Sequence, residues 1–340
     1  MSHLTRRTVL LSALALGAAG CARTPSPAST PTQSASAAAA TATVGLSYIP
    51  DIQFAPAYVA DARGLFTERG VKATLRHHGQ NEGLFTALVS GQEDFVVAGG
   101  DEMVQAVAQG QDLVAIAQYY RQYPVVLIVP DSSPIQSPAD LRGRTLGVPG
   151  RYGESWFGAQ VLLSGAGLTV DDVQITEIGY TPLAALAGGK VEALVGFANN
   201  DLVQFQQAKV PVRSIPLSAA PAPLVSIVLV TTRAYLEKNA ATAKKVADAV
   251  VAGIDAVVKQ PSLAVATSKT YVPNSDATGW DTAASATLEA TIPLWKTAEG
   301  TVSGRLEPAA WQAMTAFMLE QKLIDTPVDP ARVMSNDYLS

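Results

Sequence analysis

The chain reads SYIPDIQFAPAYVA from Ser47 to Ala60, and this stretch decides the fold. It follows a short apolar strand at residues 43–46 and leads into a helix expected from Ala55, so it is interpreted as a strand-to-helix loop. In open α/β sheets, ligands bind where such loops meet the carboxyl ends of strands. Four of its side chains offer rings, a carboxylate and an amide: Tyr48, Asp51, Gln53 and Phe54. The alternative is that Phe54 is core and Asp51 only caps the helix.

The residues after this loop alternate between strand-like and helix-like segments. Each crossover has the length of a βαβ unit, which predicts a mostly parallel sheet with helices on both faces. Two apolar runs, residues 125–129 and 225–232, are interpreted as strands that cross between two such lobes and form a hinge. We therefore predict an α/β fold of two doubly wound lobes. Lobe 1 comprises residues 44–129 and 230–340, and lobe 2 residues 130–229.

The first 21 residues have the pattern of a bacterial lipoprotein signal peptide. Arg6 and Arg7 precede an apolar segment, and small residues precede Cys21, the only cysteine in the chain. Small side chains suit the peptidase, and the thiol accepts the lipid. Residues 22–43, rich in Ala, Ser, Thr and Pro, are expected to be a disordered tether. We expect an extracytoplasmic protein, lipid-anchored to the bacterial cell membrane. The arginine pair indicates twin-arginine export, with the Sec route left open.

Composition narrows the possible partners. Of the 340 residues, 48% are hydrophobic and 16% charged, and no run approaches the ~18–20 apolar residues of a membrane span. We expect a soluble mature chain. Removing residues 1–21 leaves 22 basic and 29 acidic residues, a net charge of −7. An acidic chain without a basic stripe argues against a nucleic-acid partner. With no cysteine left after processing, disulfides and thiolate metal sites are excluded.

Short motifs in a fixed order carry a family resemblance. They are YIP at 48–50, QFAPAYVA at 53–60, GLF at 64–66, ALVSGQ at 87–92, DLRG at 140–143, LGVPG at 146–150 and LAGGKVEA at 186–193. This pattern resembles the solute-binding proteins of bacterial ABC transporters with the type II periplasmic-binding fold. Within that group it is similar to the branch that includes thiamine-pyrimidine synthases and sulfonate-, formylaminopyrimidine- and riboflavin-binding proteins. The resemblance implies a receptor that closes on a small molecule and delivers it to a membrane permease driven by an ATPase. We expect a monomer with no resident cofactor.

The loops at predicted strand ends supply the candidate ligand-binding residues. They are Tyr48, Asp51, Gln53, Phe54, Glu82, Asp101, Glu102, Tyr119, Tyr123, Tyr152, Glu154, Ser155, Trp156, Asn199 and Asn200. Aromatic residues make up only 6% of the chain but gather in these loops. Rings from two lobes suit a planar heteroaromatic ligand. Several rings, Tyr120 and Tyr180 especially, have a core position as the alternative.

Charge discriminates among the ligands of the resembling proteins. A sulfonate binder would keep helix N-termini free for the anion, whereas Asp101 and Glu102 open one predicted helix and Glu154 another. Carboxylates there repel an anion and accept N–H groups from an aminopyrimidine or the imide-like edge of a flavin. We therefore expect a thiamine-pyrimidine precursor first and riboflavin second. Two alternatives stay open: the acids only complement helix dipoles, or Arg121 or Arg151 binds an alkanesulfonate- or nitrate-type anion.

Enzyme activity is not expected. The resembling synthases carry a cysteine cluster and a lysine that binds pyridoxal phosphate, and no such signature is present here, so a synthase-like enzyme is the weaker alternative. His77 and His78 are adjacent, so they should point apart toward solvent and not share a metal ion. The segment GVPGRYG at 147–153 lacks the G-x-G-x-x-G spacing of a dinucleotide loop, and the chain has no G-x-S-x-G elbow.

Overall fold

The computed structural model describes residues 39–78, 83–217 and 223–340. The predicted signal peptide, Cys21 and most of the predicted tether lie outside these ranges. A first five-stranded sheet has the order β2-β1-β3-β10-β4. Its strands are β1 (Ala40–Leu46), β2 (Val71–His77), β3 (Phe95–Gly99), β4 (Leu113–Gln118) and β10 (Ile227–Thr232). Strand β10 runs antiparallel to β3 and β4, whereas β1 runs parallel to β2 and β3.

A second five-stranded sheet has the order β7-β6-β8-β5-β9. Its strands are β5 (Val125–Pro130), β6 (Thr145–Val148), β7 (Gln174–Glu177), β8 (Ala193–Phe197) and β9 (Val212–Ile215). Strand β5 is antiparallel to β8 and β9, and β6 is parallel to β7 and β8. Each sheet therefore contains one antiparallel strand, and the predicted α/β class with two mostly parallel, doubly wound sheets is confirmed.

The predicted boundaries need two corrections. Strand β1 begins at Ala40, so the last four residues of the predicted 22–43 tether belong to the sheet, paired with β2 from Val71 onward. The two apolar runs also do not cross between sheets. Strand β5 pairs only within the second sheet and β10 only within the first. Residues 125–129 therefore belong to lobe 2 and not to lobe 1, and residues 227–229 belong to lobe 1 and not to lobe 2. A buried apolar run does not reveal which sheet it joins.

The connection from β4 to β5 contacts the start of β10, where the chain re-enters the first sheet. Residues 119–124 connect β4 to β5, and the return ends at Ile227. The amides of Tyr119 and Tyr120 both donate to the Ile227 carbonyl oxygen, at 2.9 Å each. The side-chain amide of Gln118 donates to the Tyr120 carbonyl at 2.6 Å. Backbone hydrogen bonds therefore join the 119–124 connection to the start of β10, where two continuous strands had been predicted to cross between the lobes.

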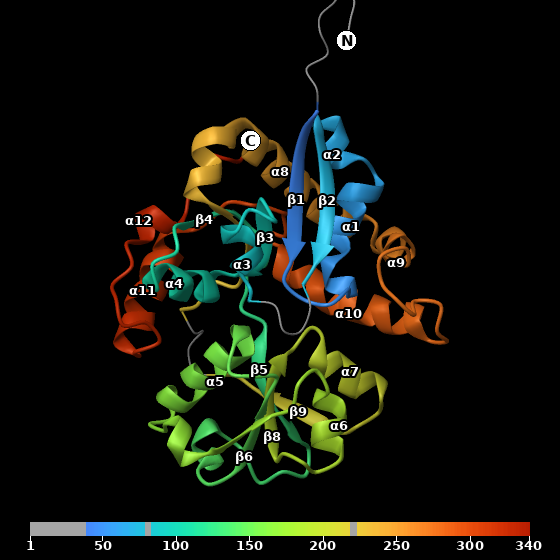
Figure 1. Ribbon diagram of the computed structural model, residues 1–340. Helices are drawn as coiled ribbons and strands as arrows, with labels where there is room; N and C mark the ends of the chain where they lie inside the picture. The colour runs from blue at the N-terminus through green and yellow to red at the C-terminus, as the bar shows by residue number, and fades with distance from the viewer. Residues whose placement is uncertain (1–38, 79–82, 218–222) are drawn as a thin grey trace, which may run out of the picture. The chain divides into compact units, whose positions relative to one another are not determined.

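Helices flank both sheets (Figure 1). Those that follow strands of the second sheet are α5 (Gly153–Gly165), α6 (Pro182–Ala187) and α7 (Asp201–Gln207). The others are α1 (Ala55–Ala62), α2 (Leu65–Glu68), α3 (Thr86–Val89), α4 (Gly100–Ala108), α8 (Arg233–Lys259), α9 (Pro261–Ser268), α10 (Trp280–Trp295), α11 (Pro308–Glu320) and α12 (Pro330–Val333). Helices α1 and α2 are separate because Gly64, between them, adopts a left-handed conformation, with φ of 71°. Among the described residues, no single helix has the length and apolarity of a membrane span.

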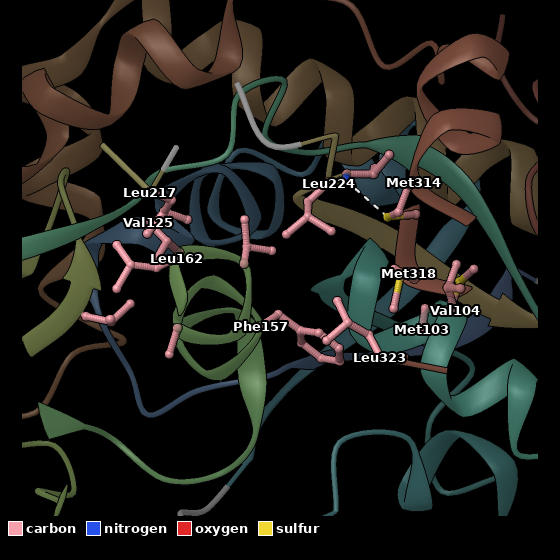
Figure 2. Packing of buried hydrophobic residues seen from close by; sticks show 14 of the residues in the cluster. Met103, Val104, Val125, Phe157, Leu162, Leu217, Leu224, Met314, Met318 and Leu323 are labelled. Atoms are coloured by element: carbon pink, nitrogen blue, oxygen red, sulfur yellow. Dashed lines mark hydrogen bonds between the residues drawn. The ribbon is translucent and has the colours of Figure 1, made fainter. Parts of the chain in front are cut away.

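Alternation along the central strands separates the core into layers. In β3, Val97 packs with α1 and α8, whereas Val96 and Ala98 face the opposite side. The opposite side is continuous with the second sheet, since the same cluster includes Val125 of β5 and residues of α5. Figure 2 shows this cluster, in which α4, α5 and α11 contribute Met103, Phe157, Met314 and Met318. Helices α4 and α5, which open at the site described next, are therefore fixed by one apolar core.

Candidate ligand-binding site

A cavity of about 550 Å³ lies where strands of both sheets end. Strand ends and helix starts supply its wall. Ser47 and Tyr48 follow β1, Pro149 follows β6, Tyr180 follows β7, and Phe197 ends β8. Glu102, Glu154 and Asp201 lie in the first turns of α4, α5 and α7. The cavity therefore forms at the strand ends where open α/β sheets bind ligands. Its volume falls within the range of small-molecule sites, roughly 300–1,000 Å³.

The structure places nine of the predicted residues on the cavity wall. They are Tyr48, Gln53, Phe54, Glu102, Tyr119, Tyr152, Glu154, Ser155 and Asn200. Tyr120 and Tyr180, for which a core position had been the alternative, line it as well. Five predicted residues do not: Asp51, Asp101, Tyr123, Trp156 and Asn199. Glu82 lies outside the described residues.

Tyrosine rings form much of the wall. Tyr48 and Tyr180 meet edge to face, with ring centroids 4.7 Å apart and planes at 82°. The hydroxyl of Tyr152, a half-exposed residue, lies 3.4 Å from that of Tyr180. Tyr119 and Tyr120 contact each other and rest against Trp295 behind them. Such rings offer flat, weakly polar surfaces to a ring-shaped ligand.

Hydrogen bonds fix the 48–54 loop in position. The Tyr48 carbonyl accepts from His77 Nδ1 at 3.0 Å, so His77 Nε2 accepts from the Tyr58 hydroxyl at 2.9 Å. Burial lowers the pKa of His77 and favours this neutral form. The Tyr119 hydroxyl donates to the Gln53 carbonyl at 3.0 Å. The loop is therefore held from two sides before any ligand binds.

Asp51 and Asn199 support the wall without lining it. Asp51 Oδ1 accepts from the Gln53 amide at 3.0 Å, which confirms the capping alternative for this residue. Asn199 is buried and its Nδ2 donates to Thr291 Oγ1 of α10 at 2.9 Å. Its neighbour Asn200 lines the cavity and donates to Gln53 Oε1 at 3.3 Å. Of two consecutive asparagines, one therefore faces the cavity and the other anchors the loop.

Asp101, Tyr123 and Trp156 also lie behind the wall. The Tyr123 hydroxyl is 2.7 Å from Asp101 Oδ2 and 2.9 Å from the Glu154 carbonyl oxygen. Asp101 is fully buried and accepts from the Glu102 amide at 2.8 Å. Trp156 packs against the apolar core and under the Arg151 guanidinium, 5.3 Å from it. On a helix, consecutive side chains point about 100° apart, so Ser155 lines the cavity and Trp156 does not.

Acidic groups on the wall have raised pKa values because burial disfavours their charged forms. The pKa of Glu102 rises to about 8 and that of Asp201 to about 6. The pKa of Glu154 rises well above its ordinary range, through burial and then through the neighbouring Asp101. Asp201 Oδ2 accepts from the Phe197 amide at 2.7 Å, which opposes the rise. The wall therefore holds carboxyl groups that keep protons near neutral pH.

The described wall contains no lysine, arginine or histidine. Arg121 instead donates to the carbonyl oxygens of Ser303 and Arg305, at 3.1 Å each, and pairs with Glu307 at 3.0 Å. Arg151 lies 3.6 Å from Glu177 on the surface. Neither guanidinium is placed to bind an anion in the cavity.

Sequence reasoning missed several wall residues. Apolar positions such as Leu84, Ile178 and Val195 carry no distinguishing signal. Asp201 did have one, because it opens a helix after a predicted strand just as Asp101 and Glu102 do.

The adjacent histidines point apart, as predicted, but not toward solvent. His78 is buried and its Nε2 lies 2.9 Å from Glu93, which also accepts from Arg76 Nη1 at 2.6 Å. His77 braces the 48–54 loop. Within the described ranges, no group of three or more His, Cys, Asp or Glu residues could hold a metal ion. Both histidines have structural partners in the first sheet's lobe.

Two five-stranded mixed sheets with a ligand-sized cavity at their strand ends define the periplasmic-binding-protein fold. The chain belongs to the NMT1/THI5-like family, whose model matches residues 51–264. The resemblance inferred from sequence is thereby confirmed at the level of the family.

Proteins with different described functions are similar to this chain. Riboflavin-binding protein RibY of Chloroflexus aurantiacus is 29% identical over 304 residues, which cover 87% of this chain and 85% of RibY. A 4-amino-5-hydroxymethyl-2-methylpyrimidine phosphate synthase of Aspergillus parasiticus is 23% identical over 154 residues, 45% of this chain and 44% of the synthase. The periplasmic aliphatic sulphonate-binding protein SsuA of Escherichia coli has a TM-score of 0.67 at 20% identity, covering 88% of this chain and 99% of SsuA. The SsuA likeness shows the fold alone.

Proposed function

We propose that this chain is the solute-binding component of an ABC importer and that it captures a neutral, planar heteroaromatic compound of the riboflavin type. One observation carries the proposal: tyrosine rings and protonatable carboxyl groups line the cavity, and the described wall has no cationic side chain. Rings stack on a planar ligand, and carboxyl groups pair with ring N–H and carbonyl groups. The similarity to RibY, which covers most of both chains, supports the same ligand class.

Riboflavin takes precedence over the thiamine-pyrimidine precursor favoured from the sequence. A single pyrimidine ring would leave much of a 550 Å³ cavity to water, whereas a tricyclic ring with a polyol chain would fill more of it. The pyrimidine remains a second ligand to test. The name of the Aspergillus synthase also contains an aminopyrimidine, but that protein matches less than half of this chain.

Two other functions are less well supported. A sulfonate or nitrate needs cationic or free N–H donors, whereas acidic residues occupy the first turns of α4 and α5 and no arginine lines the described wall. A synthase-like enzyme would need its cysteine cluster, and the chain's only cysteine is Cys21. We therefore propose a binding protein and not an enzyme.

The N-terminal sequence supports an extracytoplasmic location. Residues 1–20 would be removed as a signal peptide by cleavage before Cys21, and a lipid on Cys21 would tether the protein beside its permease. Substituting Cys21→Ser should release the protein from the membrane fraction. Mass spectrometry of the parent N-terminus should show the acyl groups, and an unmodified Cys21 would contradict the anchor.

Ligand-dependent thermal unfolding tests the ligand. The mature chain carrying Cys21→Ser would be unfolded with riboflavin, an aminopyrimidine, thiamine and an alkanesulfonate in turn. A ligand present at about 100 times its Kd adds roughly 2.7 kcal/mol to the stability of the folded state. For a domain of this size that is a rise in Tm of several degrees. A shift with riboflavin supports the proposal, whereas a shift with the sulfonate alone would overturn it.

A further inference from the structure

Three carboxyl groups from two helices meet at one side of the cavity. A Cβ built on Gly99 would lie 2.7 Å from both Asp101 Oδ1 and Glu102 Oε2, and 3.2 Å from Glu154 Cγ. Asp101 and Glu102 belong to the first turn of α4, and Glu154 to the first turn of α5. Glu102 and Glu154 line the cavity while Asp101 lies behind them. We call these three residues the carboxyl cluster.

A buried oxygen of the carboxyl cluster, Glu154 Oε2, lacks a hydrogen-bond partner among the described residues. Asp101 accepts from Tyr123 and from the Glu102 amide. Glu154 Oε1 accepts from Ser226 Oγ at 2.8 Å. Glu154 Oε2 is buried and has no hydrogen-bond partner among the described residues; the residue is 3% exposed and lines the cavity. Folded proteins leave few buried polar atoms unpaired, so this oxygen of a wall residue still has the capacity for one more hydrogen bond.

The surroundings of the carboxyl cluster keep protons on it. The other titratable groups facing it are tyrosines: Tyr120 and Tyr123 near Glu154, and Tyr180 near Glu102. No cationic side chain lines the described wall to offset negative charge. Burial raises the pKa of Asp101 to about 7 and that of Glu102 to about 8, and Glu154 lies higher than its ordinary range. Like charges this close disfavour ionisation of all three groups, which favours the neutral forms of the two glutamic acids.

We propose that Glu102 and Glu154 act as neutral carboxylic acids that recognise a lactam or imide edge of the ligand, each donating to a ring carbonyl or accepting from the adjacent ring N–H. A neutral carboxyl group carries one donor and one acceptor side by side. It therefore matches an amide edge, which a carboxylate, an acceptor only, does not. The inference rests on the proposed function and adds the chemical feature that is recognised. An isoalloxazine has such an edge.

If Glu102 and Glu154 bind the ligand as neutral acids, the affinity for the ligand should fall as pH rises. Above a pKa of about 8, Glu102 loses the proton with which it donates. Affinity for an imide should then fall by up to about tenfold per pH unit. A ligand that only donated hydrogen bonds to carboxylates would instead bind more tightly as pH rises. The slope of affinity against pH thus separates the two chemistries.

The test measures riboflavin affinity by quenching of flavin fluorescence at pH 7 and pH 9. The parent chain should bind at least fivefold more weakly at pH 9 than at pH 7. Glu102→Gln keeps a donor and an acceptor at every pH and should bind at least fivefold more tightly than the parent at pH 9. Comparison at one pH cancels any ionisation of the ligand. Glu154→Ala, which removes the unpartnered oxygen, should bind at least tenfold more weakly at pH 7. Glu237→Gln on exposed α8 is the matched control.

The outcomes separate the two proposals. Riboflavin binding that is flat with pH, or insensitive to both cluster variants, would overturn the carboxylic-acid recognition and leave the proposed function standing. No riboflavin binding at any pH would overturn the proposed function and the pairing that rests on it. Infrared spectra of the ligand-free protein report the cluster independently of binding and of activity. A protonated-carboxyl band at pH 7 that diminishes in Glu154→Gln supports the proposal, and its absence from the parent contradicts it.

Discussion

Gly253 of α8 is where the helix passes closest to α1, and substituting Gly253→Ala tests this packing. A Cβ at Gly253 would lie 2.2 Å from the Pro56 carbonyl oxygen and 3.1 Å from Ala60 Cβ. Real Cβ contacts are not shorter than 3.0 Å, so α1 and α8 must separate by nearly 1 Å. Overpacking of this kind costs about 1–3 kcal/mol, which exceeds the ~0.5–1 kcal/mol that alanine gains over glycine in a helix.

Calorimetric unfolding of the mature chain measures the effect. We expect Gly253→Ala to lower Tm by a few degrees, since about 2–4 °C corresponds to 1 kcal/mol in domains of 150–250 residues. Riboflavin affinity should fall as well, because Pro56 follows closely on the wall residues Gln53 and Phe54. Gly165→Ala is the matched control. This glycine of α5 has no atom within 4 Å of a built Cβ, so alanine should leave Tm unchanged or raise it. Equal effects of the two substitutions would refute the packing argument.

Three further predictions concern the cavity wall. The pKa of Glu102 rises from its ordinary 4.5 to about 8, so the stability that its protonated form contributes is full below pH 4.5 and is lost as pH rises to about 8. Urea unfolding should therefore show the free energy of unfolding falling more steeply with pH in the parent than in Glu102→Gln. Parallel pH curves for the two proteins would contradict this. Tyr180→Leu should weaken riboflavin binding about 2- to 12-fold through loss of ~0.5–1.5 kcal/mol of ring contact, whereas Tyr180→Phe, which keeps the ring, should weaken it less in the same titration. Asn200→Ala removes the contact with Gln53 Oε1 and should weaken binding by a similar factor, about 0.5–1.5 kcal/mol; unchanged calorimetric affinity would show that this bond does not support the closed wall.

Local patterns predicted the elements well where each carried its own signal. Strand β4 carries such a signal, because its first five residues, 113–117, form an uninterrupted apolar run. The 48–54 loop was placed correctly between a strand and a helix, and three of its four predicted side chains line the cavity. Strand β1 was predicted too short because its first residues, Ala40–Thr43, are indistinguishable in composition from the tether before them. Only their pairing with β2 identifies them as a strand.

The sequence by itself determined the class of fold, the family and the residue types available to the site, because these depend on periodicity, turn residues and short motifs. The tertiary structure decided which sheet takes β5 and β10, that Asp51 caps while Gln53 faces the cavity, and that Arg121 is committed to Ser303, Arg305 and Glu307. It also brought Asp101, Glu102 and Glu154 together from segments about fifty residues apart. Burial and mutual repulsion set the protonation of these acids, and both depend on distances that only the folded chain fixes.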